Sequence, residues 1–166
     1  MKTKAILNFI EDSLQMVEMS FEDSSWRADL PSGPGWYFIE TNTPPDVFIK
    51  VGDPKGIRHY NIPEKVNASR YLKRFGACIL PVGDSFYVVY SGESKNLKAR
   101  AREHVSGHSK TGCLALENYP LLYQYEWRFH FTPCDFDEDP NDSKLLRIFG
   151  EQIWRSKYGW PILCGK

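Results

Sequence analysis

Hydrophobic side chains recur near the start of the chain with the spacing of an amphipathic helix. The apolar positions, separated by four, four, three and four residues, are Ile6, Ile10, Leu14, Val17 and Phe21. This spacing puts them on one helical face, so we predict a helix over Lys4–Phe21. Polar and turn-forming residues follow up to Gly35. The helix is therefore expected to form an N-terminal arm within residues 1–33.

Short β-type runs and helical segments follow without a regular βαβ alternation. The predicted strands are Trp36–Glu40, Val47–Val51, Cys78–Pro81, Phe86–Tyr90 and Tyr123–Phe131. The predicted helices are Pro63–Phe75, Ser94–Val105 and a segment with its N-cap at Asp142 or Ser143 that ends at Lys157. The mixed order predicts an α+β protein, with a small, mostly antiparallel β-sheet flanked by helices in a single domain over 1–166.

The composition is that of an ordinary globular protein, with 42% hydrophobic and 25% charged residues. Aromatic residues are frequent at 14%, and they serve either a core or the stacking of nucleic-acid bases. The formal net charge is zero. A polyanionic partner would therefore have to be bound by a local basic patch, not by the overall field of the protein.

Two stretches supply such patches. Residues 46–74 hold seven Lys or Arg against three acids, and residues 91–110 hold five against two, while the compensating acids lie near the N-terminus and in Asp135–Asp142. Each stretch is either a solvated surface or a nucleic-acid contact, and the sequence leaves both open. The candidate nucleic-acid-binding residues are Arg70, Lys73, Arg74, Lys95, Lys98 and Arg102.

The four cysteines stand apart, without the paired spacing of a zinc site. No apolar run is long enough to span a membrane, and no signal peptide is recognisable. We therefore expect a cytoplasmic protein with free, structural thiols and no membrane partner.

The stretch from Phe86 to His104 carries the most specific chemistry. A β-type run is followed by an expected break at Ser91-Gly92 and by a helix that holds Arg100 and His104 one turn apart. Arg offers a bidentate fork to phosphoryl oxygens, and His exchanges protons near neutral pH. Offsets of three, four and seven from Leu97 put both on the apolar side of the helix. A snorkelling Arg and a buried structural His are the alternative.

Three short motifs in this order resemble the signatures of the GIY-YIG endonuclease superfamily. The first is Gly35-Trp36-Tyr37 at the start of a strand. The second is Tyr90-Ser91-Gly92, followed in the next helix by Ser94, Asn96-Leu97, Arg100 and His104. The third is Glu151 inside a later helix, with Pro161 and Cys164 after it.

The resemblance implies a metal-dependent endonuclease that hydrolyses phosphodiester bonds of DNA, of the restriction or phage type. It assigns Tyr37 as general base or water-positioning group, hydrogen-bonded to His104, with Tyr90 as a supporting phosphate contact. Arg100 would bind the scissile phosphate. Glu151 would bind one Mg²⁺, for which Mn²⁺ can substitute. Cleavage of both strands at a palindrome would suggest a dimer. A non-catalytic nucleic-acid-binding module on the same scaffold is the alternative.

This chain departs from the family pattern at four positions. Trp36 and Ser91 stand in place of aliphatic residues, Glu93 in place of a frequent basic residue, and Cys164 in place of an Asn. Tyr37 and Tyr90 are also far apart in the sequence. We therefore expect an insertion at about 42–84 between the first two core strands, which would suit an accessory part that holds DNA.

Overall fold

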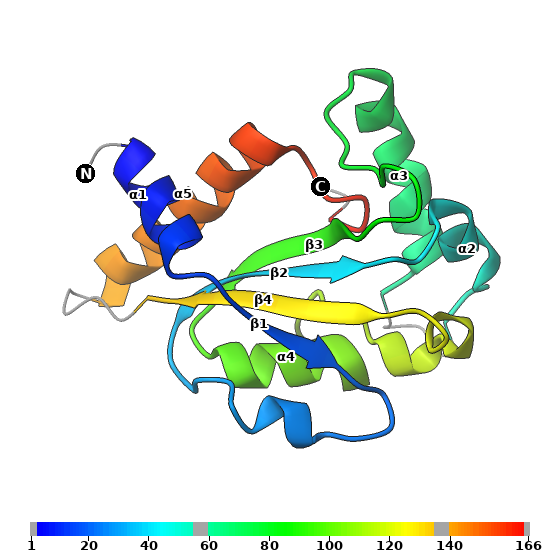
Figure 1. Ribbon diagram of the computed structural model, residues 1–166, viewed down its shortest axis with the longest axis horizontal. Helices are drawn as coiled ribbons and strands as arrows, with labels where there is room; N and C mark the ends of the chain where they lie inside the picture. Colours follow the sequence, from blue (N-terminus) through cyan, green and yellow to red (C-terminus); the bar gives the residue numbers. More distant parts are fainter. Residues whose placement is uncertain (1–2, 55–59, 135–139, 165–166) are drawn as a thin grey trace.

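A computed structural model describes residues 3–54, 60–134 and 140–164. Its centre is a four-stranded antiparallel sheet in the order β1-β4-β2-β3 (Figure 1). The strands are β1 Gln15–Met19, β2 Gly35–Thr41, β3 Tyr87–Ser94 and β4 Trp127–Pro133. Helices flank this sheet, so the predicted α+β class is confirmed. The predicted acidic run falls partly on residues 135–139, which lie outside the described residues.

The N-terminal segment is helical only in its first half. Helix α1 spans Thr3–Asp12, and β1 then pairs with β4, with Val17 opposite Phe129. The prediction of one helix through Phe21 is therefore wrong beyond Asp12. The apolar positions of 14–21 fit a helical face, but β4 offers a free backbone edge with which Gln15–Met19 forms hydrogen bonds. Tertiary pairing thus overrides the local pattern.

The segment between β2 and β3 holds two helices. Helix α2 covers Pro45–Lys50, where a strand over Val47–Val51 was predicted. That prediction is wrong because Pro45 stands in the first helical turn with Asp46, both favourable there, and because Phe48 is fully buried. Helix α3 covers Ile62–Arg74 and starts one residue before the predicted Pro63. The side chain of Asn61 caps it by accepting a hydrogen bond from the Glu64 amide.

Five further elements differ from the predictions in their bounds. Strand β3 continues through Ser91-Gly92, where a break was expected. Strand β4 starts at Trp127 because the preceding residues form two 3₁₀ turns, η2 Leu116–Asn118 and η3 Pro120–Leu122. Of the run predicted as a strand at Cys78–Pro81, only Cys78 forms a β-bridge, with Trp160. Helix α4 covers Leu97–Ser106 and α5 covers Pro140–Tyr158, two residues before the predicted N-cap.

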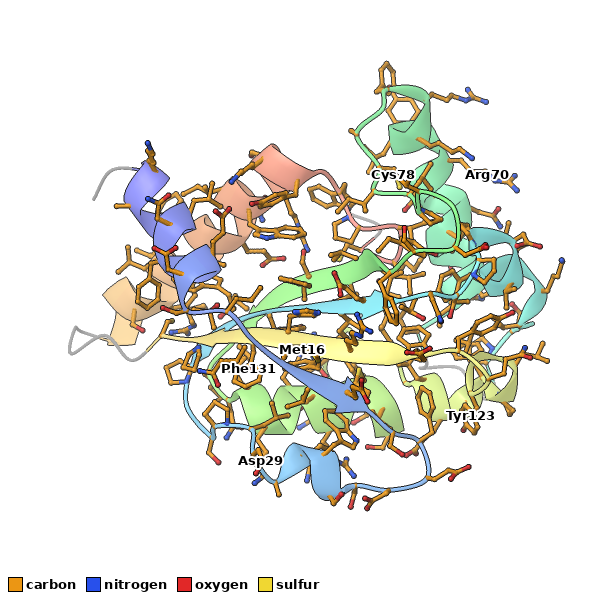
Figure 2. All side chains as sticks on the ribbon, viewed as in Figure 1. Met16, Asp29, Arg70, Cys78, Tyr123 and Phe131 are labelled. Atoms are coloured by element: carbon orange, nitrogen blue, oxygen red, sulfur yellow. The ribbon has the colours of Figure 1, made fainter. Side chains whose placement is uncertain are left out.

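The sheet separates two hydrophobic layers (Figures 1 and 2). Helix α4 and the short η1 Ser25–Arg27 cover one face, over a core that includes Ile39, Val89 and Phe129. Helices α1 and α5 cover part of the other face around Trp36 and Trp154. Helices α2 and α3 stand at one end of the sheet. None of the helices in the described ranges is long and apolar enough to cross a membrane.

The segment Pro161–Cys164 runs along the outer edge of β3. The Leu163 amide donates to the carbonyl of Val89 at 2.9 Å, and the Ser91 amide donates to Cys164 Sγ at 3.2 Å. These contacts satisfy part of the backbone that an edge strand would otherwise leave open. They also fix Cys164 beside the strand that carries Tyr90 and Gly92.

Candidate active site

The Tyr37 hydroxyl is the point at which two other predicted catalytic residues, Arg100 and His104, meet. Tyr37 lies in the middle of β2, between Gly92 of β3 and Phe131 of β4, and its side chain faces α4. Its hydroxyl oxygen lies 2.9 Å from Nε2 of His104 and 2.9 Å from Nε of Arg100. The structure thus brings together residues that are 63 and 67 positions apart in the sequence.

His104 is a hydrogen-bond donor in this cluster. The Leu114 amide donates to Nδ1 at 3.2 Å, so Nδ1 carries no proton. Burial, followed by the charge of Arg100, holds the pKa of His104 well below its usual range. The ring is therefore neutral, its single proton is on Nε2, and it donates that proton to the Tyr37 oxygen. This assignment follows from the hydrogen-bond network.

The Tyr37 oxygen receives a second hydrogen bond from Arg100 Nε. A phenol oxygen has two lone pairs, and both are used by these donors, so the proton of Tyr37 itself is free to be donated to another group. Burial, with Tyr90 as a further cause, raises the pKa of Tyr37 well above its usual value, although Arg100 opposes this shift. Tyr37 is consequently protonated at neutral pH.

Arg100 is held on three sides. Besides Tyr37, its guanidinium donates to Glu103 Oε2 at 3.0 Å and to the carbonyl of Gly112 at 2.7 Å. Thr111 Oγ1 donates to the same Glu103 oxygen at 3.0 Å. The interactions with Tyr37, Tyr90 and Glu103 raise the pKa of Arg100 despite its burial, so the group remains charged. The site therefore contains a fixed, partly neutralised cation.

Tyr90 forms the wall of the cluster next to Arg100. Its hydroxyl donates to the carbonyl of Gly112 at 3.0 Å and lies 3.4 Å from Arg100 Nη2. The ring packs edge-on against His104, with centroids 4.6 Å apart. Burial raises the pKa of Tyr90 to about 12. The predicted placement of Tyr37 and Tyr90 on neighbouring strands, close to the helix, agrees with the structure.

Gly92 permits the close approach of Tyr37 to β3. A Cβ atom at this position would lie 2.5 Å from the Tyr37 hydroxyl oxygen and 2.7 Å from its Cζ. Gly92 was predicted to lie in a break after the strand, but it is part of the continuous strand β3. The glycine is therefore required by the tyrosine ring that packs over it.

Glu151 approaches from the other face of β3. Helix α5 packs closely against β2, because Gly150 leaves room for the indole of Trp36, which donates to the Arg147 carbonyl at 2.6 Å. The next residue, Glu151, forms an ion pair with Arg155. Burial raises the pKa of Glu151, and the charges of Arg155 and Arg100 oppose that shift. The positive charge of Arg100 thus reaches Glu151, although it is a smaller cause of the pKa shift than burial and Arg155.

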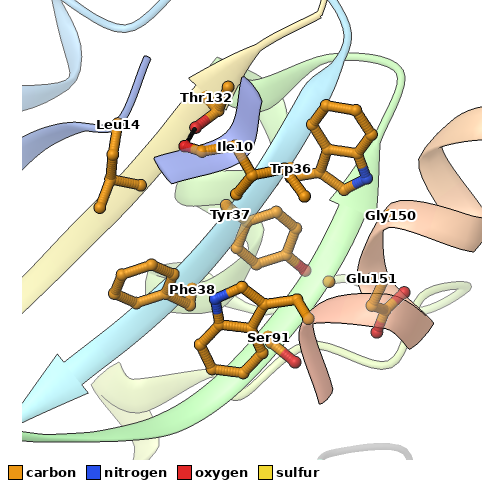
Figure 3. Close-up of a pocket in the computed structure, with 11 residues that line it drawn as sticks. Ile10, Leu14, Trp36, Tyr37, Phe38, Ser91, Thr132, Gly150 and Glu151 are labelled. Carbon is orange, nitrogen blue, oxygen red and sulfur yellow. Dashed lines mark hydrogen bonds between the residues drawn. The ribbon is translucent and has the colours of Figure 1, made fainter. Parts of the chain in front are cut away.

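A small cavity lies on the α5 side of the sheet (Figure 3). Its volume is about 20 Å³, enough for about one water molecule. The lining is mainly apolar and includes Ile10, Trp36, Phe38 and Trp154, and its polar residues are Tyr37, Ser91, Thr132 and Glu151. Glu151 therefore stands at the border between an apolar layer and the polar edge of β3.

Two arginines of α5 were not identified from the sequence. Arg155 donates from Nε to Ser91 Oγ at 2.9 Å and from Nη2 to Cys164 Sγ at 3.3 Å. Arg147 donates from Nε to Glu93 Oε2 at 2.9 Å. Both arginines lie four positions from Glu151, so they share its helical face. This spacing in the sequence could have identified them as neighbours of Glu151. Their partners Ser91, Glu93 and Cys164 are departures from the family pattern.

The predicted nucleic-acid-binding residues form two separate groups. Lys95 precedes α4, and Lys98 and Arg102 lie along it, where Lys98 Nζ donates to the carbonyl of Ala28 at 3.1 Å. The other group, Arg70, Lys73 and Arg74, lies on α3 beyond the end of the sheet (Figure 2). The structure does not bring the two groups together, and it leaves all but Lys98 exposed.

The described ranges contain no group of three or more His, Cys, Asp or Glu side chains arranged to hold a metal ion. A carboxylate such as Glu151 fits Mg²⁺, which keeps several waters and takes few protein ligands. The ion pair with Arg155 engages Oε1. Among the causes of the Glu151 pKa shift, the charge of Glu93 adds to the effect of burial, whereas the charge of Arg155 opposes it. Cys78, Cys113 and Cys164 are free thiols.

Comparison with protein-family models, with curated proteins and with solved structures found no match to this chain.

Proposed function

We propose that this chain is a metal-dependent endonuclease of the GIY-YIG type that hydrolyses phosphodiester bonds of DNA. The observation that carries the proposal is the Tyr37 hydroxyl, which accepts hydrogen bonds from His104 and Arg100 and keeps its own proton available. A fixed cation beside an oriented phenol is suited to a phosphodiester, whose charge increases in the transition state. Restriction or phage-type cleavage is the context that the sequence motifs suggest.

Arg100 binds the scissile phosphate in this proposal. Its side chain is only 13% exposed, so its charge is little screened by water. Hydrogen bonds to Tyr37, Tyr90, Glu103 and Gly112 already orient the guanidinium. Such preorganisation is a main source of catalysis, and removal of one donor of this kind costs about 10²–10³ in rate. Tyr90 supports the same phosphate.

Tyr37 positions the attacking water or acts as its general base. As a neutral phenol it donates one hydrogen bond, which orients the oxygen atom that accepts it. If it acts as a base, its pKa must first fall, and the two donors on its oxygen stabilise the phenolate that results. His104 Nε2–H and Arg100 Nε–H thus support either role.

Glu151 holds one divalent cation at the edge of β3, most simply Mg²⁺, with Mn²⁺ as a substitute. When bound, the ion supplies positive charge to the phosphate and the leaving oxygen. Arg155 holds the carboxylate through its ion pair. The free thiols of Cys78, Cys113 and Cys164 fit a reducing cytoplasm, and cleavage of both strands would bring two copies of the chain together.

One observation favours a second candidate, a non-catalytic module that binds nucleic acid. The Arg100 guanidinium is engaged by Glu103 and by the Gly112 carbonyl, and Tyr37 has a raised pKa. A scaffold with these internal contacts would bind a phosphate backbone through its surface lysines and arginines without cutting it.

Incubation with supercoiled plasmid tests the two candidates. The endonuclease predicts nicking with Mg²⁺ that EDTA abolishes and that Tyr37→Phe, Arg100→Ala and Glu151→Ala each lose. Tyr125→Phe and Glu117→Ala are matched controls away from the site, and they should cut like the parent. Tight DNA binding without cleavage in Mg²⁺ or Mn²⁺ would reject the enzyme and support the module. Lack of any salt-dependent binding would reject both.

A further inference from the structure

Helix α3 ends in an exposed aromatic pair surrounded by cations. The rings of Tyr71 and Phe75 are in edge-to-face contact, with centroids 5.0 Å apart, although the two residues are 66% and 68% exposed. Arg70, Lys73 and Arg74 are exposed next to them, and no ion pair to any of these three is found among the described residues. We call these five residues the α3 tip; Figure 2 shows it projecting away from the sheet.

The side chains of the α3 tip do not pack on the core of the protein. The core side of α3 is formed by Ile62, Val66 and Ser69, and Ser69 Oγ donates to the Ile162 carbonyl at 2.6 Å. Tyr71 and Phe75 therefore contribute little to the packing of the helix. Large apolar groups that remain in water, at the centre of a basic surface, are typical of a binding site.

The N-terminal end of α3 lies next to the candidate active site. The ring of Tyr60, just before the helix, packs edge-on against Tyr90 with centroids 6.3 Å apart, and Lys65 lies over the Tyr60 ring. A helix rises about 1.5 Å per residue, so Arg74 lies about 18 Å along the axis from Ile62. A strand that keeps the duplex rise of about 3.4 Å per nucleotide and leaves Tyr90 along α3 would reach the tip after about five nucleotides, and a more extended strand after fewer.

We propose that the α3 tip binds single-stranded or unpaired nucleic acid, with a base stacked on Tyr71 or Phe75 and phosphates held by Arg70, Lys73 and Arg74. Bases stack on exposed aromatic rings without sequence preference, and neighbouring cations follow the backbone. Duplex DNA hides the faces of its bases, so the aromatic pair favours a gap, flap or frayed end. This inference rests on the proposed function, because the position of the cut relative to the α3 tip is that of the candidate active site.

The test measures binding alone, in the Tyr37→Phe variant with EDTA, so it remains valid if the chain proves not to cut. Fluorescence anisotropy with labelled single strands and duplexes compares three changes. These are Tyr71→Ala/Phe75→Ala, Arg70→Ala/Lys73→Ala/Arg74→Ala, and the control Phe149→Ala, another exposed aromatic, on α5. A Tyr71→Leu/Phe75→Leu variant retains apolar area but removes the stacking faces.

We expect the Ala and Leu aromatic variants to bind single strands about tenfold more weakly, with an unchanged salt slope and little change for duplexes. The charge variant should reduce the slope of log K against log salt by about two for single strands. Parent affinity should rise between four and eight nucleotides. Single-strand binding by the aromatic variants that equals that of the parent would overturn the proposal. A loss of binding to anionic lipid vesicles, with single-strand binding unchanged, would also overturn it and would indicate a membrane surface instead.

Discussion

Nε2 of His104 donates a hydrogen bond to the hydroxyl oxygen of Tyr37, which lies 2.9 Å away. The direction of this bond follows from the proton-free Nδ1, which accepts from the Leu114 amide. His104 consequently does not take a proton from Tyr37 in the resting state. It orients the phenol and would stabilise a phenolate.

Tyr37→Phe should abolish cleavage and leave DNA affinity nearly unchanged. The oxygen is buried and makes no contact that would hold a distant part of the duplex. Its removal leaves the buried Nε2–H of His104 and Nε–H of Arg100 without an acceptor, at a cost of about 1–3 kcal/mol. Urea unfolding measures that cost, and a plasmid assay measures the rate. Cleavage at parental rate would contradict the assigned role.

Gly92→Ala should disturb the site more than a surface change of the same size. The added Cβ would stand 2.5 Å from the Tyr37 oxygen, so the ring must shift away from His104 and Arg100. Overpacking of this kind costs about 1–3 kcal/mol, and the displaced hydroxyl should lower activity strongly. Gly33→Ala is the control, because a Cβ there has no neighbour within 4 Å. Equal activity of both variants would argue against a catalytic Tyr37.

Glu103→Gln should strengthen the interaction of Arg100 with a phosphate. The carboxylate offsets the guanidinium charge at 3.0 Å, and the amide would keep a hydrogen bond while removing the negative charge. We expect a lower KM for a short DNA substrate with kcat little changed. A decrease in kcat with KM unaffected would indicate instead that the charge of Glu103 holds Arg100 in its active orientation.

The free energy of unfolding should fall in mild acid because of His104. Its pKa is lowered in the folded protein, so below about pH 6.5 the unfolded chain binds a proton that the folded chain does not. The stabilisation is complete above that pH and is lost as pH falls, by about 1.4 kcal/mol per pH unit, until the folded-state pKa is reached. His104→Gln should show a smaller decline between about pH 6.5 and 5 in urea unfolding. Parallel declines would contradict the neutral, buried imidazole.

Cys164 should behave as a hydrogen-bond acceptor, not as a reactive thiol. Burial raises its pKa to about 11, so iodoacetamide at about pH 8 should modify it only after unfolding. Cys164→Ala should cost about 1–3 kcal/mol, since the buried Ser91 amide loses its acceptor, whereas Cys164→Ser should recover most of that loss. Rapid native alkylation, followed by peptide mass analysis, would contradict this.

Local pattern predicted those parts of the fold whose stability is local. The helix that carries Arg100 has a good N-cap in Asn96 and a clear apolar arc, and it was placed to within a few residues. The second half of the N-terminal segment was wrong because Gln15–Met19 depends on its hydrogen bonds to β4, which are distant in sequence. The helix α2 was missed because a short β-branched run outweighed the Pro45-Asp46 start signal.

The sequence predicted some of the residues that the structure brings together in the candidate site, but not the hydrogen bonds between them. Spacing placed Arg100 and His104 on one arc, and the motif order placed Tyr37 near them. The donor role of His104 depends on the Leu114 amide, which reaches Nδ1 through a loop that has no periodic pattern. Likewise, Arg147 and Arg155 contact β3 only because α5 packs against it.

A β-sheet usually insulates the groups on one face from those on the other. Here the charge of Arg100 lowers the pKa of Glu151, which α5 carries. The negative charge of Glu151 likewise contributes to the raised pKa of Tyr90 on the far side. A substitution that changes the charge of α5 would thus change the pKa values of the tyrosines on the other face of the sheet without contacting them.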